Sequence, residues 1–270
     1  MNPWLETAGV VIIAIFGVLA GKKLSYFRRP YWIIGYFLSF MLIAILAASR
    51  WNNSLDFIPP ICWLTTGRTR FVALLLAVTI GLTVPLSRLP HRFEKIVTCV
   101  LMSVVVVWFA VMPFLVPGLI RNGLSEIHTI VDAEGICFQS RDYTCGPAAA
   151  VTALRRLGLA ADEGELAILA HTNPITGTLP SCLSAALQKR YGNKGLICEY
   201  RHFDDVGQLK DSGITLAVVR DAFLSDHCVA VLGVSDRLVT IADPVSGKML
   251  MPHDEFEKNW RFAGIVLKRI

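Results

Sequence analysis

Charged residues are scarce in this 270-residue chain. Lys, Arg, Asp and Glu together make up 17% of the sequence, against about 25% in an average soluble domain. Hydrophobic residues make up 54%, and the mean hydropathy is +0.53. This composition excludes a disordered chain, a coiled coil and a small disulfide scaffold. It also argues against a wholly soluble protein.

Several functional signatures are missing as well. No Gly-x-x-x-x-Gly-Lys-Ser/Thr loop is present, so a P-loop nucleotide site is not expected. No cysteine pair has Cys-x-x-Cys spacing and no His/Cys cluster has zinc-ligand spacing, so we expect no metal and no other cofactor. Residues 1–120 hold 10 Lys/Arg and 3 Asp/Glu, whereas the remaining residues hold 16 and 18. The basic excess therefore lies in the apolar part and does not indicate nucleic-acid binding, which needs a basic face on a folded domain.

The first 120 residues contain four apolar stretches close to the length of a membrane-spanning helix, roughly 17–25 residues. We expect spans at about residues 3–21, 31–48, 71–86 and 96–120. The first stretch carries Glu6 but lacks the basic n-region and cleavage site of a signal peptide, so we interpret it as a retained span. Residues 57–64 (FIPPICWL) are apolar but interrupted by two prolines, which indicates an interfacial or re-entrant piece.

The distribution of cations predicts the orientation of these spans, because cytoplasmic loops are enriched in Lys and Arg. The first and third connecting loops carry seven cations, namely Lys22, Lys23, Arg28, Arg29, Arg88, Arg92 and Lys95. The middle loop carries three, namely Arg50, Arg68 and Arg70. We therefore expect the first and third loops in the cytoplasm. The C-terminal domain would then lie on the extracytoplasmic side of a bacterial cytoplasmic membrane.

Residues 121–270 change character and are numerous enough for one independent core. Helices are expected first, at 147–157, from 162 onward and at 180–191. Strands follow at 197–202, 214–220, 227–234, 238–242 and 264–268, with an extended lead-in at 127–131 and a short helix at 254–260. The helix signals are Pro147 at a first position, Gly158 after a helix end, and a capping box from Asp162 to Glu165. Helices before strands predict an α+β domain rather than alternating βαβ units.

Four residues of this domain form a candidate catalytic set. Cys145 directly precedes a predicted helix, whose N-terminal amides favour a thiolate. Gln139 lies six residues upstream, where its amide can join the Cys145 backbone N–H in an oxyanion hole. His227 begins an apolar strand and is a candidate general base. Asp243 ends the next strand, and two antiparallel strands would bring it to the same sheet edge as His227, where it can orient the imidazole.

Each of these residues also has a plain structural explanation. Cys145 can be a packing residue, His227 a strand-end histidine facing water, and Asp243 part of an Asp-Pro turn that stops a strand. The order Gln, Cys, His, Asp at these element boundaries is far less expected by chance than any one of them. The set favours nucleophilic catalysis by a cysteine.

The sequence around these residues resembles the C39 cysteine peptidases. The resemblance rests on Gln139-Ser-Arg-Asp-Tyr-Thr-Cys145-Gly-Pro, on HCVAVLGV from His227, and on IADPVSGK around Asp243. It covers roughly residues 134 to 270. It implies a papain-like fold with Cys145 as nucleophile, His227 as base, Asp243 as its orienter and Gln139 as oxyanion donor. A peptide or protein substrate follows from the same resemblance.

The chain also departs from the exporters for which this family is best known. In those proteins the peptidase domain comes first and an ATPase follows, whereas here the apolar part comes first and no P-loop is present. We therefore expect a membrane-bound cysteine peptidase in contact with the lipid bilayer, acting on exported or membrane-associated peptides. Two alternatives stay open: a non-catalytic peptide-binding module serving a partner exporter, and a transpeptidase using the same thioester.

The other cysteines leave two possibilities. In an oxidising compartment, Cys137, Cys182, Cys198 and Cys228 can form two disulfides in three pairings. In a reducing compartment they are buried thiols. Cys228 follows His227 on a strand, so it is expected to face the core.

Overall fold

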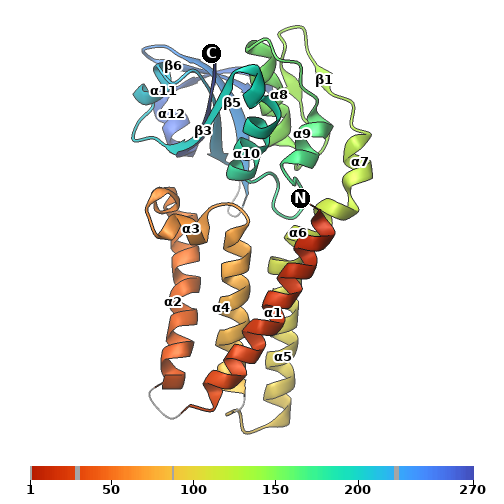
Figure 1. Ribbon diagram of the computed structural model, residues 1–270. Coiled ribbons are helices and arrows are strands. Elements are labelled where there is room, and N and C mark those ends of the chain that lie inside the picture. The colour runs from red at the N-terminus through yellow and green to blue at the C-terminus, as the bar shows by residue number, and fades with distance from the viewer. Residues whose placement is uncertain (1, 28–30, 87, 222–224) are drawn as a thin grey trace. The chain divides into compact units, whose positions relative to one another are not determined.

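The computed structural model describes residues 2–27, 31–86, 88–221 and 225–270. The chain separates into two compact units, Met1–Leu119 and Ile120–Ile270. The first unit is helical, and the second combines helices with a sheet (Figure 1). The fold class expected from the sequence, an apolar helical bundle followed by an α+β domain, is confirmed.

Four segments of the first unit are long and apolar enough to cross a membrane. They are α1 (Pro3–Ser25), α2 (Tyr31–Trp51), α4 (Thr69–Leu86) and the run formed by α5 (Arg92–Val106), the π-helical η2 (Val107–Val111) and α6 (Met112–Leu119). The apolar piece at 57–64 lies between two short helical elements, η1 (Asn53–Phe57) and α3 (Ile61–Thr65).

The acidic residue in the first apolar stretch has a partner. Glu6 forms an ion pair with Arg68, which precedes α4. The guanidinium of Arg68 lies 4.2 Å from the ring centroid of Phe114 on α6. Because charged groups in membrane segments are costly unless they are paired, this arrangement explains how α1 tolerates an acidic residue.

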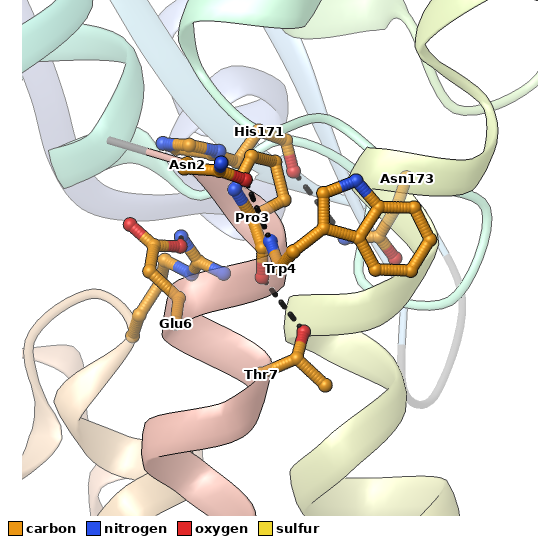
Figure 2. Close-up of polar contacts among 8 residues, drawn as sticks. Asn2, Pro3, Trp4, Glu6, Thr7, His171 and Asn173 are labelled. Atoms are coloured by element: carbon orange, nitrogen blue, oxygen red, sulfur yellow. Dashed lines mark hydrogen bonds and ion pairs between the residues drawn. The ribbon is translucent and has the colours of Figure 1, made fainter.

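The N-terminal end of α1 is closed by local hydrogen bonds. Asn2 Oδ1 accepts the Trp4 N–H at 3.1 Å, and Thr7 Oγ1 donates to the Pro3 carbonyl at 2.8 Å (Figure 2). An Asn cap with a proline in the first turn is a typical helix start. The helix therefore begins at Pro3, as the sequence predicts.

Arg88, between α4 and α5, ties two of the connecting loops together. Its Nη2 donates to the carbonyls of Ser25 and Phe27 at 3.2 and 3.3 Å. The first and third loops therefore lie at the same end of the helical unit, as four antiparallel spans require (Figure 1). Arg28 and Arg29, two of the seven cations of these loops, lie outside the described residues.

The second unit contains α7 (Arg121–Ser125) and three larger helices. These are α8 (Cys145–Arg156), α9 (Glu163–Leu169) and α10 (Pro180–Tyr191). The predicted boundary signals are confirmed at two of them. Asp162 caps α9 by accepting the Glu165 N–H at 2.8 Å, and Gly158 follows α8 with a φ of +72°, the left-handed conformation that favours glycine.

A six-stranded antiparallel sheet forms the other half of this unit. Its order is β3-β8-β4-β5-β6-β7, and a small separate pair joins β1 (Ile130–Val131) to β2 (Cys137–Phe138). The large sheet consists of β3 (Leu196–His202), β4 (Ile214–Arg220), β5 (Asp226–Val234), β6 (Leu238–Asp243), β7 (Gly247–Pro252) and β8 (Trp260–Arg269). The remaining elements are η3 (Gly192–Lys194), α11 (Gly207–Lys210) and α12 (His253–Asn259).

Three sequence expectations differ from this topology. The edge strand β7 was not expected, because its sequence GKMLMP has no polar–apolar alternation. The extended lead-in at 127–131 is a strand only at Ile130–Val131. Trp260 starts β8 rather than ending the preceding helix, because it pairs with Val219 of β4.

The core of this unit has two parts, one on each face of the sheet. On one side α8 is almost entirely buried together with Leu183, Leu187 and Tyr191 of α10. On the other side Phe203, Phe256 and Trp260 pack together, with ring centroids 5.3 Å apart in both pairs that include Trp260. The burial of α8 against the sheet holds the N-terminus of this helix, and therefore Cys145, in a fixed place.

Candidate active site

The helix α8 begins two residues before the predicted start, so that Pro147 is its third residue rather than its first. Cys145 is the first residue of α8 and is 9% exposed. The first backbone hydrogen bond of the helix runs from the Ala148 N–H to the Thr144 carbonyl, at 3.0 Å. The amide of Cys145 therefore precedes the helical ladder, where N–H groups are free to serve other acceptors. The Thr144 hydroxyl does not cap the helix, since it donates to the Arg141 carbonyl at 2.9 Å.

The antiparallel strands β5 and β6 bring His227 and Asp243 together. Ala230 pairs with Ala242, and the register shifts between Val231 and Gly233. At the site end of the strand pair, His227 Nε2 lies 3.0 Å from Asp243 Oδ1. The two side chains are only 17% and 16% exposed. The two side chains therefore contact each other at one end of the β5–β6 pair, as the sequence predicts.

The Asp243 carboxylate is also fixed by the turn that follows it. Its Oδ1 accepts the N–H of Val245 at 2.7 Å and that of Ser246 at 3.3 Å. Burial raises the pKa of Asp243, but the hydrogen bonds from His227 and from these amides outweigh it, so the pKa lies below its usual 3.8. The carboxylate is therefore charged at neutral pH.

The pKa of His227 is shifted in the opposite direction, upward. Burial lowers the pKa of its imidazole, but the interactions with Asp243 and with Cys145 raise the pKa from 6.5 to about 10. Since Nε2 faces Asp243, Nδ1 is the ring nitrogen left for the Cys145 thiol. The ring contacts Asp243, and its raised pKa keeps it charged at neutral pH.

Gln139 lies on the segment that joins β2 to α8. Its backbone N–H donates to the Pro244 carbonyl at 2.9 Å, which ties this segment to the turn after Asp243. Its side-chain Oε1 is buried and has no hydrogen-bond partner among the described residues. The amide oxygen is thus not engaged by a neighbouring side chain.

A polar loop packs beside the helix start. A Cβ added to Gly146 would lie 3.0 Å from Thr178 Cβ, so only glycine fits here without displacement. Thr178 Oγ1 is 2.8 Å from Thr172 Oγ1, and Asn173 Oδ1 accepts the N–H groups of Ile175 and Thr176. Figure 2 shows Asn173 turned back toward the His171 carbonyl. Residues 172–178 therefore form a loop that is held by its own hydrogen bonds and packs against the start of α8, next to Cys145.

Glu163 and Ser140 are two further residues near the site that the sequence does not indicate. Glu163 is fully buried and accepts two hydrogen bonds from Ser140, the residue after Gln139. The sequence showed only that an acidic residue follows the helix cap Asp162. No local signal indicates that this side chain turns inward.

All seven cysteines are free thiols. Cys228 packs against the core that contains α8, as expected from the strand alternation. Burial, followed by the proximity of Cys145 and Asp243, raises the pKa of Cys228 well above 9.0. Burial also raises the pKa of Cys137 and that of Cys198 to about 12. These thiols are protonated at neutral pH. No group of three or more His, Cys, Asp or Glu residues within the described ranges could hold a metal ion.

Two archaeal proteins of unknown role are similar to this chain. One, from Methanothermobacter marburgensis, is 33% identical over 144 residues, which are 53% of this chain and 95% of that protein. The other, from Methanothermobacter thermautotrophicus, is 31% identical over 141 residues, 52% of this chain and 93% of that protein.

Two solved structures are similar at lower identity. One is a double glycine motif protease from an AMS/PCAT transporter in complex with the leader peptide, with 18% identity, coverage of 53% and 93% of the two chains, and a TM-score of 0.42. The other is the peptidase domain of Streptococcus ComA, a bifunctional ABC transporter, with 21% identity, coverage of 53% and 100%, and a TM-score of 0.43.

The family model described as Peptidase C39 family matches residues 134–269, half of the chain. The matched segment contains Gln139, Cys145, His227 and Asp243, the residues whose surroundings are described above. The protein belongs to the Peptidase C39 family.

Proposed function

We propose that this protein is a membrane-bound cysteine peptidase. Cys145 would be the nucleophile, His227 the general acid and base, Asp243 the residue that orients and charges His227, and Gln139 the side-chain oxyanion donor. The observation that carries the proposal is the 3.0 Å contact between His227 Nε2 and Asp243 Oδ1, at a histidine whose pKa is raised by both Asp243 and Cys145. A thiolate paired with an imidazolium is the reactive form of a catalytic cysteine.

The reaction would be acyl transfer through a thioester. The Cys145 thiolate attacks the scissile carbonyl carbon, and the C=O π electrons move to the oxygen. Gln139 and the Cys145 backbone N–H stabilise this oxyanion. His227 then donates its Nδ1 proton to the leaving amine as the C–N bond breaks. The neutral ring takes a proton from water, whose oxygen attacks the thioester carbon. The resulting oxyanion collapses, the C–S bond breaks, and the acid leaves while the Cys145 thiolate is regenerated beside the protonated ring.

The four apolar helices support attachment to a membrane. We further propose that the membrane is the cytoplasmic membrane and that the peptidase unit lies on its extracytoplasmic side. The excess of Lys and Arg in the first and third loops, which meet at one end of the bundle, supports this orientation. The substrates would then be exported or membrane-associated peptides.

Site-resolved alkylation tests the site and the orientation together. Intact cells are treated with a membrane-impermeant thiol reagent at mildly acidic pH, and labelling of Cys145 is followed by mass spectrometry. We expect fast labelling in the wild type and slow labelling in His227→Ala. His128→Ala, which changes an exposed histidine of the same unit, should label like the wild type. Labelling only after permeabilisation would refute the orientation, and slow labelling indifferent to His227 would refute the ion pair.

Peptide cleavage tests the activity itself. The full-length protein in detergent is incubated with a proteome-derived peptide mixture, and new termini are identified by mass spectrometry. We expect new termini with the wild type and none with Cys145→Ala. Capture of the acyl group by an added amine, without free acid product, would instead indicate a transpeptidase. No new termini and no amine adduct would indicate a binding module.

A further inference from the structure

Glu163 is a buried carboxylate whose hydrogen bonds lead directly to the proposed oxyanion donor. It is the first residue of α9 and is 0% exposed. Its Oε1 accepts the Ser140 backbone N–H at 2.8 Å, and its Oε2 accepts the Ser140 hydroxyl at 2.7 Å. Both oxygens therefore hold one residue, the one that follows Gln139.

A second set of contacts fixes Glu163 itself. Its backbone N–H donates to Thr129 Oγ1 at 2.9 Å, and the Thr129 hydroxyl donates to Asp162 Oδ2 at 2.8 Å. Asp162 in turn caps α9. The carboxylate is thus attached to a helix end with little freedom to move. The solvation that its carboxyl group loses on burial is replaced by the two hydrogen bonds from Ser140.

The segment Gln139–Ser140 is consequently held from both sides. The Gln139 N–H is bound to Pro244, next to Asp243, and Ser140 is bound to Glu163. Because the Gln139 Oε1 has no hydrogen-bond partner among the described residues, these backbone and Ser140 contacts are what set the position of the amide.

We propose that Glu163 is a positioning residue for catalysis, which acts through Ser140 to hold Gln139 where an oxyanion forms. This inference rests on the proposed function. Oxyanion donors act only in the transition state, and loss of one typically costs about 10²–10³ in kcat. A displacement of about 1 Å far from the chemistry can cost about 10²-fold. Removal of Glu163 should therefore slow acylation and leave the nucleophile intact.

Two electrophiles that react with the same Cys145 separate these effects. Acylation by p-nitrophenyl acetate passes through an oxyanion and is followed as a burst of p-nitrophenolate. Alkylation by iodoacetamide has no oxyanion and reports only on the thiolate. Both are measured on the full-length protein in detergent, with Cys145 modification resolved by mass spectrometry because six other thiols are present.

We expect Glu163→Ala to slow acylation of Cys145 by about 10- to 100-fold and to change alkylation less than twofold. Glu163→Gln should retain most of the acylation rate, since its amide can accept from the Ser140 N–H and donate to the Ser140 hydroxyl. The double variant Glu163→Ala/Gln139→Ala should acylate no more slowly than Gln139→Ala alone, because both substitutions remove the same function, the oxyanion contact of Gln139. Glu165→Ala is the matched control, since this neighbouring carboxylate on α9 is 41% exposed and pairs with Arg190.

Three results would overturn the inference. Acylation could be unchanged in Glu163→Ala, it could fall together with alkylation, or the double variant could be slower than both single variants. If Glu163→Ala does not fold, Ser140→Ala, which removes the hydroxyl's 2.7 Å bond to Glu163 Oε2 and its 3.4 Å contact with the His128 carbonyl, must show the same selective loss of acylation. A wild-type protein that alkylates rapidly but gives no burst would refute the proposed function, and the inference with it. A wild-type burst unaffected by Glu163→Ala or Ser140→Ala would refute the inference alone.

Discussion

Replacing Asp243 by Asn tests how the charge of His227 is maintained. The substitution keeps the shape of the side chain and an oxygen acceptor for Nε2, but it removes the negative charge. In the wild type, Nε2 and Asp243 Oδ1 are 3.0 Å apart, and neither side chain is more than 17% exposed. Burial alone would lower the pKa of His227, so Asp243 and Cys145 together account for its rise from 6.5 to about 10.

The size of the effect follows from this rise. A tenfold change in acidity corresponds to about 1.4 kcal/mol, so the site favours the imidazolium by about 5 kcal/mol relative to water. One adjacent opposite charge shifts a pKa by about 1–3. We therefore expect the pKa of His227 to fall to between about 7 and 9 in Asp243→Asn. Cys145→Ser should also lower it, since Cys145 is the other group that raises the pKa of His227.

Nuclear magnetic resonance of the full-length protein, labelled with ¹³C at histidine Cε1, measures this pKa directly. The chain has six histidines, and the resonance of His227 is the one lost in His227→Gln. The other five serve as internal controls, because Asp243→Asn should leave their titration unchanged. A wild-type His227 that titrates near 6.5, or one that titrates at the same pH in both proteins, would refute the argument.

Further predictions concern the oxyanion, the helix start, stability against pH, and the core. Gln139→Ala should slow acylation of Cys145 by about 10²–10³ with alkylation unchanged, as the two-electrophile assay measures. Gly146→Ala should slow both the alkylation and the acylation of Cys145, because the added Cβ meets Thr178 at 3.0 Å. Alkylation and acylation at the wild-type rates would contradict the close packing. The folded-state pKa of His227 lies above its unfolded value of 6.5, so its contribution to stability is complete below pH 6.5 and is lost as pH rises through about 10. Thermal denaturation between pH 6.5 and 9.0 should show this loss in the wild type and not in His227→Gln. Above pH 9.0 the raised pKa values of Cys137 and Cys198 add an alkaline loss in both proteins. Tyr191→Phe removes the hydrogen bond to the Ala160 carbonyl at 3.1 Å and should lower the free energy of unfolding in urea by about 1 kcal/mol; no change would indicate that the bond contributes nothing.

Local signals in the sequence determined most element boundaries. The helix α10 has the predicted limits Pro180–Tyr191, and proline fits its first turn. Gly192 does not end the helical path, since it is right-handed and begins η3; the left-handed glycine that ends this path is Gly195, with a φ of +80°. Strand β4 has the predicted limits Ile214–Arg220, since a short apolar run marks it. The four apolar helices were equally predictable, because length and composition alone decide whether a helix can cross a membrane.

Nonlocal contacts decided what the patterns missed. The sequence GKMLMP of β7 has no alternation, and it becomes a strand because β6 offers a free edge, with Val239 paired to Met251. Trp260 becomes part of β8 through its pairing with Val219, although Phe262 interrupts the strand with a φ of +53°. Backbone pairing across a sheet depends on a partner that local sequence does not contain.

For the site, residue type and element boundaries were enough to choose Gln139, Cys145, His227 and Asp243 as candidates. The 3.0 Å approach of His227 to Asp243, and the charge state that results from it, came only from the register of β5 and β6. Glu163 could not be chosen at all, because 23 residues separate it from Ser140. The sequence thus determines which chemical groups are present and which helix or strand carries them. Their distances and burial, and therefore their pKa values, exist only once the tertiary fold has removed water from around them.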